Sequence, residues 1–339
     1  MNSSAPSPET ELARFIAALP KTETHLHIEG ALPWELLCRA NPAKYPSPPA
    51  SWHPDFRFRS FAHFEGELLG YAGDYFQSPE RYHECAKAVF ADRLARNIHY
   101  VETSFASGCI DFMGLDGRAV CDAIRAAVPA GLEVRIFLGI HHNGWTEKMS
   151  PVLESALSWP NLDGIDLHGA EDIPVDPAAP AYFRRARGAG KFTKAHAGEF
   201  QGAGFVRFAV EELGAQRIEH GVRAIEDPAV AALLAERRIA LDVCPVSNVK
   251  LRVVPSAAAH PIRRLMDSGV ACTVSTDDPV SFGNTPEDEY LLLARDLGFS
   301  KNELARVART GFEVALAPAE WKNPRIRQID EIVSQGTLV

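Results

Sequence analysis

The sequence predicts an α/β protein that closes into a (β/α)8 barrel, also called a TIM barrel, with a helical lid inserted between strands 1 and 2. Two observations support this prediction. Eight segments with strand character alternate with helical segments over 339 residues, the pattern of parallel strands joined by crossover helices. No G-x-G-x-x-G motif follows the first strand, so an open dinucleotide-binding sheet lacks its fingerprint.

The first third of the chain holds one strand and several helices. Residues 1–8 are expected to form a disordered tail, followed by an amphipathic helix that Pro20 ends. The alternating pattern of residues 22–30 predicts the first strand. A proline- and aromatic-rich loop is expected at 41–58. The helices expected in this part are 9–19, 33–40, 60–76 and 78–96.

From residue 98 onward the alternation is regular. The expected strands are 98–105, 133–140, 164–168, 192–197, 217–220, 239–243 and 270–276. The expected helices between them are 117–127, 149–158, 180–189, 204–213, 228–236 and 261–268. Two helices, 286–297 and 301–316, are expected to close the chain. Because the sequence shows no repeat or clear linker, residues 9–339 are expected to form a single (β/α)8 barrel domain.

Composition excludes several classes of function. A net charge of −9 argues against nucleic acid as a partner, because phosphate binding needs a basic surface. Six cysteines without a C-x-x-C pair indicate free thiols in a reducing compartment. The N-terminal segment has no signal-peptide pattern, and no apolar run is long enough to span a membrane. The sequence therefore predicts a cytoplasmic protein without a membrane partner, and leaves its oligomeric state open.

Residue types that bind metals fall at the ends of four predicted strands. His25 and His27 are two residues apart, so both side chains point to one side of the first strand. His196 and His220 end the fifth and sixth strands, and an Asp277-Asp278 pair follows the eighth. Functional groups of this fold collect at these strand ends. Histidine and aspartate together suit zinc, so the joint occurrence predicts a metal site.

Each of these stretches also has a structural interpretation. A His-x-His pair can pack in a core, and the aspartate pair can cap the next segment. Lys194 shares a strand face with His196, and we expect it to be a paired structural lysine. Phe61 and Phe64 have helical spacing, which is usual for core residues, although they are also candidates for an apolar lid.

The ordered motifs resemble those of the adenosine deaminase family of the amidohydrolase superfamily. The resemblance rests on PKTETHLHIEG at 20–30, HAGE at 196–199, RIEHG at 217–221, CPVSN at 244–248 and STDDP at 275–279. It implies one zinc ion per chain, held by His25, His27, His196 and Asp277. It further implies hydrolytic deamination of a 6-aminopurine nucleoside, so that water and adenosine would give inosine and ammonia.

The resemblance also implies a role for each remaining site residue. Glu199 would protonate the purine at N1, and the Gly169 amide, in DLHGAE at 166–171, would meet N3. His220 would orient and deprotonate the water that zinc activates, and Asp278 would help to position that water against C6. Because a carboxyl must carry a proton to donate it, we expect the surroundings of Glu199 to keep it protonated.

The substrate's N9 substituent is less determined. Glu29 stands where adenosine deaminases usually carry an aspartate that reaches the ribose, and this glutamate resembles the adenine deaminase branch. Adenine and aminodeoxyfutalosine are therefore alternative substrates. A binuclear amidohydrolase would show a lysine ending the fourth strand, where this chain has His168. A catalytically silent binding relative would have lost a ligand or Glu199, and neither is lost.

Overall fold

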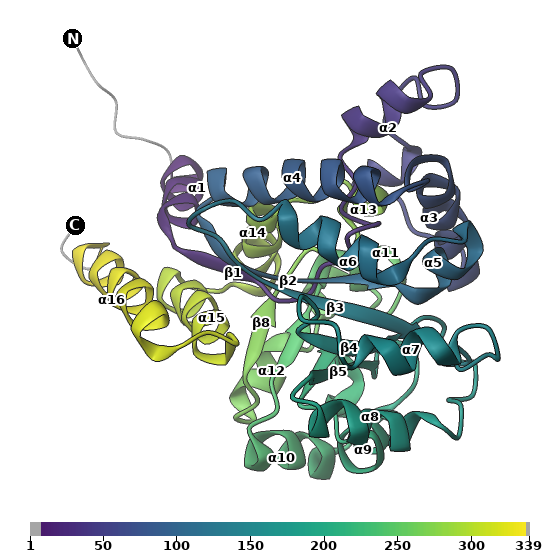
Figure 1. Cartoon of the computed structure of the whole chain (residues 1–339). Coiled ribbons are helices and arrows are strands. Elements are labelled where there is room, and N and C mark those ends of the chain that lie inside the picture. Colours follow the sequence, from purple (N-terminus) through teal and green to yellow (C-terminus); the bar gives the residue numbers. More distant parts are fainter. Residues whose placement is uncertain (1–7, 337–339) are drawn as a thin grey trace.

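The computed structural model describes residues 8–336 and confirms the (β/α)8 barrel (Figure 1). Each strand pairs in parallel with the next one along the chain. The strands are β1 (Lys21–Glu23), β2 (Ile98–Ala106), β3 (Glu133–His141), β4 (Gly164–His168), β5 (Phe192–Ala197), β6 (Arg217–His220), β7 (Leu241–Val243) and β8 (Cys272–Val274). Of the tail expected at 1–8, residues 1–7 lie outside the described residues.

The barrel is nearly closed where the segment after β1 meets the segment after β8. Leu26 forms a parallel bridge with Asp277, and the Asp277 N–H donates to the His25 carbonyl at 3.3 Å. In return, the His27 N–H donates to the Asp277 carbonyl at 3.2 Å. β1 itself is shorter than expected, because after Glu23 the chain pairs only through single bridges, Leu26 with Asp277 and His27 with Ser104. This closure brings two candidate ligands against a third.

The helices expected from the sequence are present, with small differences at their ends. Local signals explain several boundaries: Thr285 and Ser300 form capping boxes with Asp288 and Glu303. The helices are α1 (Pro8–Ala18), α2 (Trp34–Ala40), α3 (Phe61–Tyr75), α4 (Pro79–Ala95), α6 (Gly117–Ala126), α7 (Ser150–Ala156), α8 (Ala179–Gly188), α9 (Ala203–Phe208), α10 (Pro228–Arg237), α12 (Ile262–Asp267), α14 (Pro286–Leu297) and α15 (Lys301–Val314).

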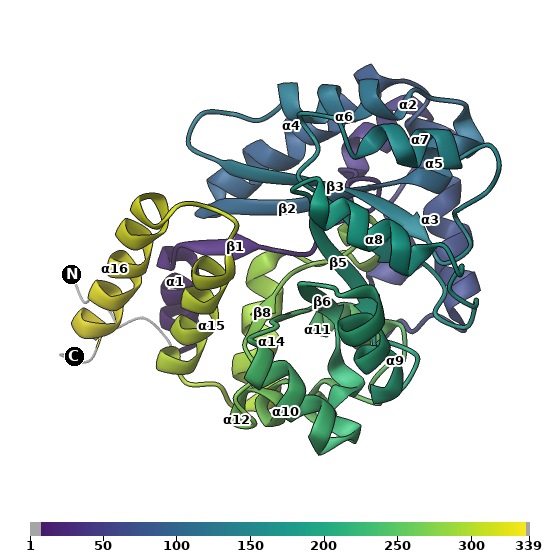
Figure 2. The ribbon, with the colours of Figure 1, turned by 60° about the horizontal axis from the view of Figure 1, so that its bottom comes forward.

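Further helical elements were not expected. The prediction that two helices close the chain was wrong, because a third, α16 (Ala319–Gly336), follows and packs beside α15 (Figure 2). Pro324 lies inside α16, and an internal proline normally argues against a helix. The other unexpected elements are α5 (Ser107–Met113), α11 (Pro245–Lys250), α13 (Pro279–Phe282) and the 3₁₀ turns Ala50–Trp52, Val222–Glu226 and Ala257–Ala259. The helix expected at 204–213 is present as α9 followed by a π turn, Ala209–Leu213.

The segment between β1 and β2 carries α2, α3 and α4. α2, α3 and α5 gather at one end of the barrel (Figure 1). Phe64 of α3 stacks on Phe282 of α13 with ring centroids 5.3 Å apart. The Trp52 indole N–H donates to the Val280 carbonyl at 2.8 Å. These contacts fix the inserted segment to the loop after β8, and its action as a lid stays a prediction.

The barrel interior below the strand ends is charged. The Lys194 Nζ lies 2.6 Å from Glu219, 3.1 Å from Asp242 and 3.2 Å from Glu102, with the lysine only 2% exposed. Burial alone would lower the pKa of Lys194, but the three carboxylates raise it above its ordinary value. Arg217 pairs with the same Glu102 at 2.5 Å. Lys194 is therefore a paired structural lysine, as expected.

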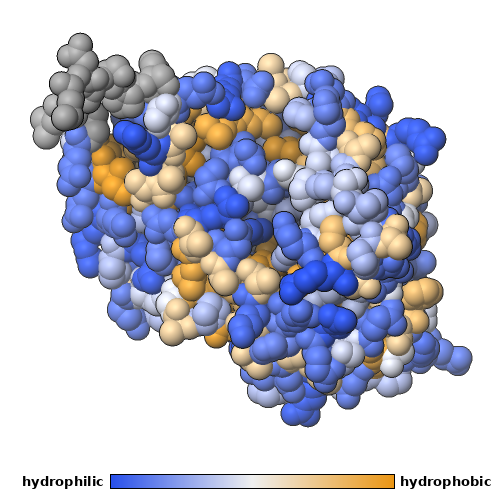
Figure 3. All heavy atoms as spheres, turned by 90° about the horizontal axis from the view of Figure 1, so that it is seen from above, coloured by the Kyte–Doolittle hydropathy of each residue, from blue (hydrophilic) through white to orange (hydrophobic). Residues whose placement is uncertain are grey.

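The hydropathy of the outer surface and of the helices is relevant to binding partners, including membranes. Figure 3 shows a face that is mostly hydrophilic, with hydrophobic residues in separate small groups. In residues 8–336, no helix has the length and apolar character needed to cross a membrane.

Candidate active site

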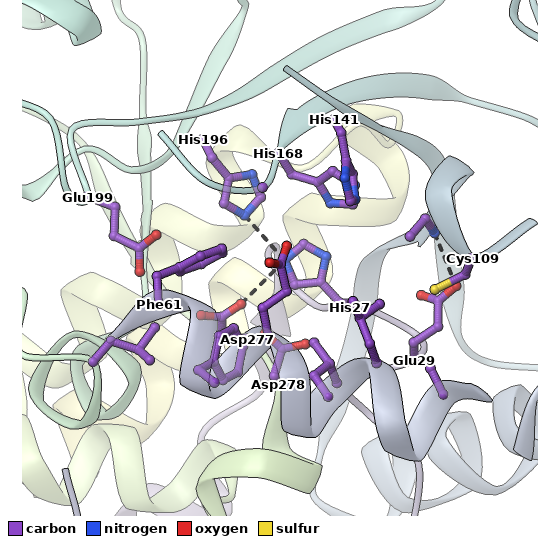
Figure 4. A pocket seen from close by; sticks show the side chains of 18 of the residues that line it. His27, Glu29, Phe61, Cys109, His141, His168, His196, Glu199, Asp277 and Asp278 are labelled. Carbon is purple, nitrogen blue, oxygen red and sulfur yellow. Dashed lines mark hydrogen bonds and ion pairs between the residues drawn. The ribbon is translucent and has the colours of Figure 1, made fainter. Parts of the chain in front are cut away.

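Four candidate ligands meet at the strand ends (Figure 4). The His27 Nε2 lies 3.4 Å from the His25 Nε2 and 3.2 Å from the His196 Nε2. The Asp277 Oδ1 is 3.3 Å from the Nε2 atoms of both His25 and His27. The structure thus brings together the three histidines and the aspartate that the sequence singled out.

The other ring nitrogens show that this cluster fits a cation. The His25 Nδ1 lies 3.1 Å from the Asp242 carbonyl, and the His196 Nδ1 lies 3.2 Å from the Leu167 carbonyl. A carbonyl only accepts hydrogen bonds, so in the neutral rings Nδ1 carries the hydrogen and Nε2 presents a lone pair. Lone pairs that converge within 3.2–3.4 Å repel one another. A metal ion with bonds of about 2.0–2.1 Å removes that repulsion.

His220 lies beside this cluster. Its Nε2 is 3.8 Å from the Asp277 Oδ2, farther than the distances among the four donors. One ligand atom each from His25, His196, His220 and Asp277 also falls within 4.8 Å of the others. The shorter distances favour His27 over His220 as the third imidazole ligand, and they leave His220 facing the cluster from one side.

Two of these residues have an unusual backbone. His220 has φ of 59° and Asp277 has φ of 67°, in the left-handed region that non-glycine residues rarely adopt. Both stand where a strand ends, and the conformation turns their side chains towards the other donors. Such strain persists where the surrounding structure enforces it, and it concentrates at functional sites.

Glu199 is buried at the edge of the cluster. Its side chain is 4% exposed, and its Oε1 lies 3.7 Å from the His220 Nε2 without a hydrogen-bond partner in the described part of the chain. Burial, followed by the negative charges of Asp277 and Glu171, raises the pKa of Glu199 well above its ordinary value. The direction agrees with the expectation of a protonated carboxyl.

The loop that carries Glu199 is held by a second carboxylate. Glu171 accepts hydrogen bonds from the backbone N–H groups of Glu199 at 3.1 Å and Phe200 at 2.7 Å, and from that of Gln201. Three backbone donors on one carboxylate fix the loop relative to β4. Glu171 thereby positions the Glu199 side chain without touching the metal donors.

Asp278 also lies buried at the cluster, 3% exposed, and its Oδ1 has no hydrogen-bond partner in residues 8–336. Burial and then the charge of Asp277 raise the pKa of Asp278 well above its ordinary value. A Cβ at Gly30 would lie 1.7 Å from that Oδ1, so only glycine leaves room for the carboxyl. Gly30 is thus required by the close approach of Asp278.

These residues line one pocket of about 710 Å³, a volume that includes its open mouth. The same pocket is lined by the candidate substrate-binding residues, Gly169, Glu29, Phe61 and Phe64, and by Glu199, His220 and Asp278. Figure 4 shows that the pocket extends from Glu199 on one side to Glu29 and Cys109 on the other. Of the candidate site residues, His25 alone is absent from the lining, because it lies behind His27 and His196.

Sequence reasoning missed the partners that orient the ligands. The His27 Nδ1 lies 2.8 Å from the Ser104 hydroxyl, and the His196 Nδ1 lies 2.9 Å from Glu219 and 3.2 Å from Asp166. Glu219 stands in the RIEHG motif and Asp166 in DLHGAE. Both residues therefore belong to motifs that the sequence singles out, but no role was predicted for either. The Glu29 Oε1 is already bonded to the Tyr82 hydroxyl at 2.9 Å and to the Ala106 N–H at 3.0 Å.

Comparison with known sequences identifies relatives along most of the chain. The profile of a protein family described as adenosine deaminase matches residues 20–332. An aminodeoxyfutalosine deaminase of Streptomyces coelicolor is 33% identical over 96% of this chain and 87% of its own length. An adenine deaminase of Rhodopseudomonas palustris is 32% identical over 97% of this chain and 98% of its own length.

Solved structures resemble the whole barrel. An adenine deaminase from Arthrobacter aurescens has a TM-score of 0.84 and 25% identity, covering 93% of this chain and 99% of its own. An amidohydrolase from Burkholderia ambifaria, solved with bound zinc, has a TM-score of 0.83 and 23% identity, covering 100% of this chain and 97% of its own. At 23% identity, the likeness to the Burkholderia ambifaria amidohydrolase concerns the fold alone.

Proposed function

The chain belongs to the adenosine deaminase family of metal-dependent hydrolases that act on C–N bonds, and we propose that it removes ammonia hydrolytically from a 6-aminopurine. One observation carries this proposal. A buried carboxyl with a raised pKa, Glu199, shares a pocket with His220 and with three of the four proposed metal donors, His27, His196 and Asp277. Deamination of a purine needs a proton donor for the ring and an activated water, and this pocket has groups for both.

We propose that one zinc ion per chain is held by His25, His27, His196 and Asp277. Three imidazoles and one carboxylate are a donor set that zinc accepts. When bound, zinc would lower the pKa of water to about 7 and so supply a nucleophile at neutral pH. The lone pairs that converge in this cluster support the assignment.

The purine would be held and activated by Gly169 and Glu199. The Gly169 amide would donate to N3, which fixes the ring edge. Attack of water at C6 moves an electron pair of the C6–N1 double bond onto N1. The proton held by Glu199 would pass to N1 and neutralise the charge that develops there.

His220 and Asp278 would act on the attacking water from the other side. The His220 Nε2 lies 3.8 Å from the Asp277 Oδ2, and a carboxyl oxygen of Asp278 lies near His27 and Asp277. We propose that they orient the water oxygen towards C6, while the proton that this water loses passes to N6 of the purine. Cleavage of the C6–N6 bond then releases the protonated amino group as ammonia, and the remaining hydroxyl proton at C6 returns to the Glu199 carboxylate, which leaves a 6-oxopurine.

The names of the relatives favour adenine and aminodeoxyfutalosine over adenosine as the substrate. With N1 of the purine against Glu199, N9 would point towards the far end of the pocket, near Cys109 and Glu29. The pocket continues into that end, which supports a purine with a substituent at N9. We therefore propose aminodeoxyfutalosine as the first candidate and adenine as the second.

An ultraviolet assay of the zinc-loaded protein would test this proposal. The assay would compare kcat/KM for aminodeoxyfutalosine, adenine, adenosine, deoxyadenosine and AMP. We expect kcat/KM for aminodeoxyfutalosine to be at least about 100-fold higher than for adenosine. The reason is that a site whose polar groups bind one ligand discriminates strongly against another ligand that leaves those groups unpaired. Preference for adenine would select the second candidate. Absence of turnover of any purine, with zinc bound, would overturn the proposed function.

A further inference from the structure

A line of buried hydrogen bonds runs from the backbone of the first residue of α12 to the ring of His220. The Ile262 N–H donates to the His260 Nδ1 at 3.2 Å. The His260 Nε2 lies 3.1 Å from the Asn248 Oδ1, and the Asn248 Nδ2 lies 3.1 Å from the His220 Nδ1. Asn248 is fully buried, His260 is 4% exposed and His220 is 1% exposed.

The direction of each bond in this line follows from its first donor. A backbone N–H can only donate, so the His260 Nδ1 accepts and the hydrogen of its neutral ring is on Nε2. Burial lowers the pKa of His260 to about 3, so the ring is neutral at ordinary pH. The His260 Nε2–H must then donate to the Asn248 carbonyl oxygen, which leaves the Asn248 amide to donate to His220.

We propose that Asn248 and His260 are positioning residues that hold the neutral His220 ring with its hydrogen on Nε2. The Asn248 amide occupies the lone pair of the His220 Nδ1, so the other ring nitrogen keeps the hydrogen and points it into the pocket. Two carboxyl oxygens lie near that nitrogen and can accept a hydrogen bond, the Glu199 Oε1 at 3.7 Å and the Asp277 Oδ2 at 3.8 Å. Both are compatible with an N–H at that position.

This assignment changes the part that His220 plays before reaction. A ring with a hydrogen on Nε2 donates to the reacting oxygen and cannot take a proton at the same atom. The family resemblance implies that His220 deprotonates the water, whereas the relay makes the resting ring a hydrogen-bond donor that orients it. This consequence for the reaction rests on the proposed function; the position of the hydrogen does not.

The relay connects three elements that are separate in the sequence. His220 ends β6, Asn248 lies in α11, and His260 precedes α12. The alternative orientation of the Asn248 amide would place two donors, its Nδ2 and the His260 Nε2–H, against each other in a buried site. An unmade hydrogen bond of that kind costs about 1–3 kcal/mol. This cost would therefore keep the amide in one orientation.

Nitrogen-15 NMR of the zinc-loaded protein would test the proposal. The two ring nitrogens of a neutral histidine give distinct signals, according to which of them carries the hydrogen. We would assign the His220 signals and compare the wild type with His260→Leu, His260→Gln and Asn248→Asp. His83→Leu is a matched control, because His83 also bonds a carbonyl, that of Ala123, but on α4.

The expected result is a protonated Nε2 on His220 in the wild type and in His260→Gln, whose amide can still donate to Asn248. Asn248→Asp offers only acceptors, so the hydrogen should move to Nδ1. His260→Leu should give a mixture of both forms. In His260→Leu and Asn248→Asp, kcat should fall about 10- to 100-fold with KM changed less than about threefold, the usual effect of losing an orienting partner.

Two outcomes would overturn the proposal: a wild-type His220 with the hydrogen on Nδ1, or His220 signals that stay unchanged in His260→Leu and Asn248→Asp. The NMR result needs no substrate. If no purine is turned over while the NMR pattern is as expected, the proposed function fails and the assignment of the hydrogen stands.

Discussion

At the scale of single residues, Glu199 shows how burial prepares a side chain for acid chemistry. An exposed glutamate is ionised at neutral pH and has no proton to give. Here the protein removes water from the carboxyl and surrounds it with the negative charges of Asp277 and Glu171, so the neutral form is favoured. The same surroundings provide no hydrogen bond for Oε1 in the described residues, which leaves that atom available to a ligand.

Replacing Glu199 with glutamine should abolish most turnover and keep the metal. The amide matches the neutral carboxyl in shape but cannot transfer its proton, so kcat should fall about 100- to 10,000-fold. Metal analysis of the purified variant should still find one ion per chain. An exposed carboxylate, Glu212, changed to glutamine serves as the control. A Glu199→Gln variant with wild-type kcat would refute the acid role.

Because its pKa is raised, Glu199 also lowers the stability of the folded protein at higher pH. Because the folded protein holds a proton that the unfolded chain releases above about pH 4.5, stability from this group is lost as pH rises towards the folded pKa. Glutamine does not ionise, so Glu199→Gln should melt at a higher temperature than the wild type at pH 8. Calorimetry should show a smaller difference in melting temperature between the variant and the wild type at pH 5 than at pH 8. Equal differences at both pH values would contradict the shift.

At the scale of elements, α3 packs the inserted segment against two loops of the pocket, the one that carries Glu199 and the one that carries Asp278. Phe61 meets Phe200, the neighbour of Glu199, with ring centroids 5.3 Å apart. Phe64 stacks on Phe282, four residues after Asp278. The helix therefore contributes apolar side chains to the pocket and also packs against the loops that carry Glu199 and Asp278.

Phe61→Ala should weaken substrate binding more than it slows chemistry. Losing part of an apolar wall removes about 1.5 kcal/mol of burial, which corresponds to a rise in KM of about tenfold. Steady-state kinetics should show kcat within about threefold of the wild type. Phe112→Ala, on α5 and 85% exposed, is the matched control. An unchanged KM would show that Phe61 does not contact the substrate.

The elements that the sequence predicts best are those with a clear local signal, such as a buried run with marked ends. β4, β5 and β6 begin and end where expected, because each is a buried run bounded by polar or glycine residues. α5, α11 and α13 span only four to seven residues, too few for a helical period to show. The bond from Asn248 to His220 depends on how α11 lies against β6, which no local pattern contains.

At the scale of the whole molecule, charge rather than apolar packing fills the barrel beneath the metal donors. Lys194 and Arg217 neutralise most of the charge of Glu102, Glu219 and Asp242. Glu219 also contacts the His196 Nδ1, and the Asp242 backbone accepts from the His25 Nδ1. The network that supports the barrel thus also orients two ligands.

Lys194→Met should destabilise the whole fold. The substitution leaves three buried carboxylates around an apolar side chain, and breaking a buried ion pair costs about 3–5 kcal/mol. Urea unfolding should show a free energy of unfolding lower by that amount. Lys87→Met, at an exposed position of α4, should change it little. Equal stability of Lys194→Met and the wild type would mean that the cluster rearranges to compensate.

The hydrogen bond between Trp52 and Val280 gives the protein a built-in optical probe. The indole is anchored two residues after Asp278, and a Cβ at Gly283 would lie 2.4 Å from its Cγ, so the ring is closely confined beside the pocket loop. Adding the true substrate to Glu199→Gln should therefore shift tryptophan fluorescence without turnover. Introducing Trp52→Phe should remove most of the shift, although four other tryptophans remain. Fluorescence titration would then measure affinity for each candidate purine separately from catalysis.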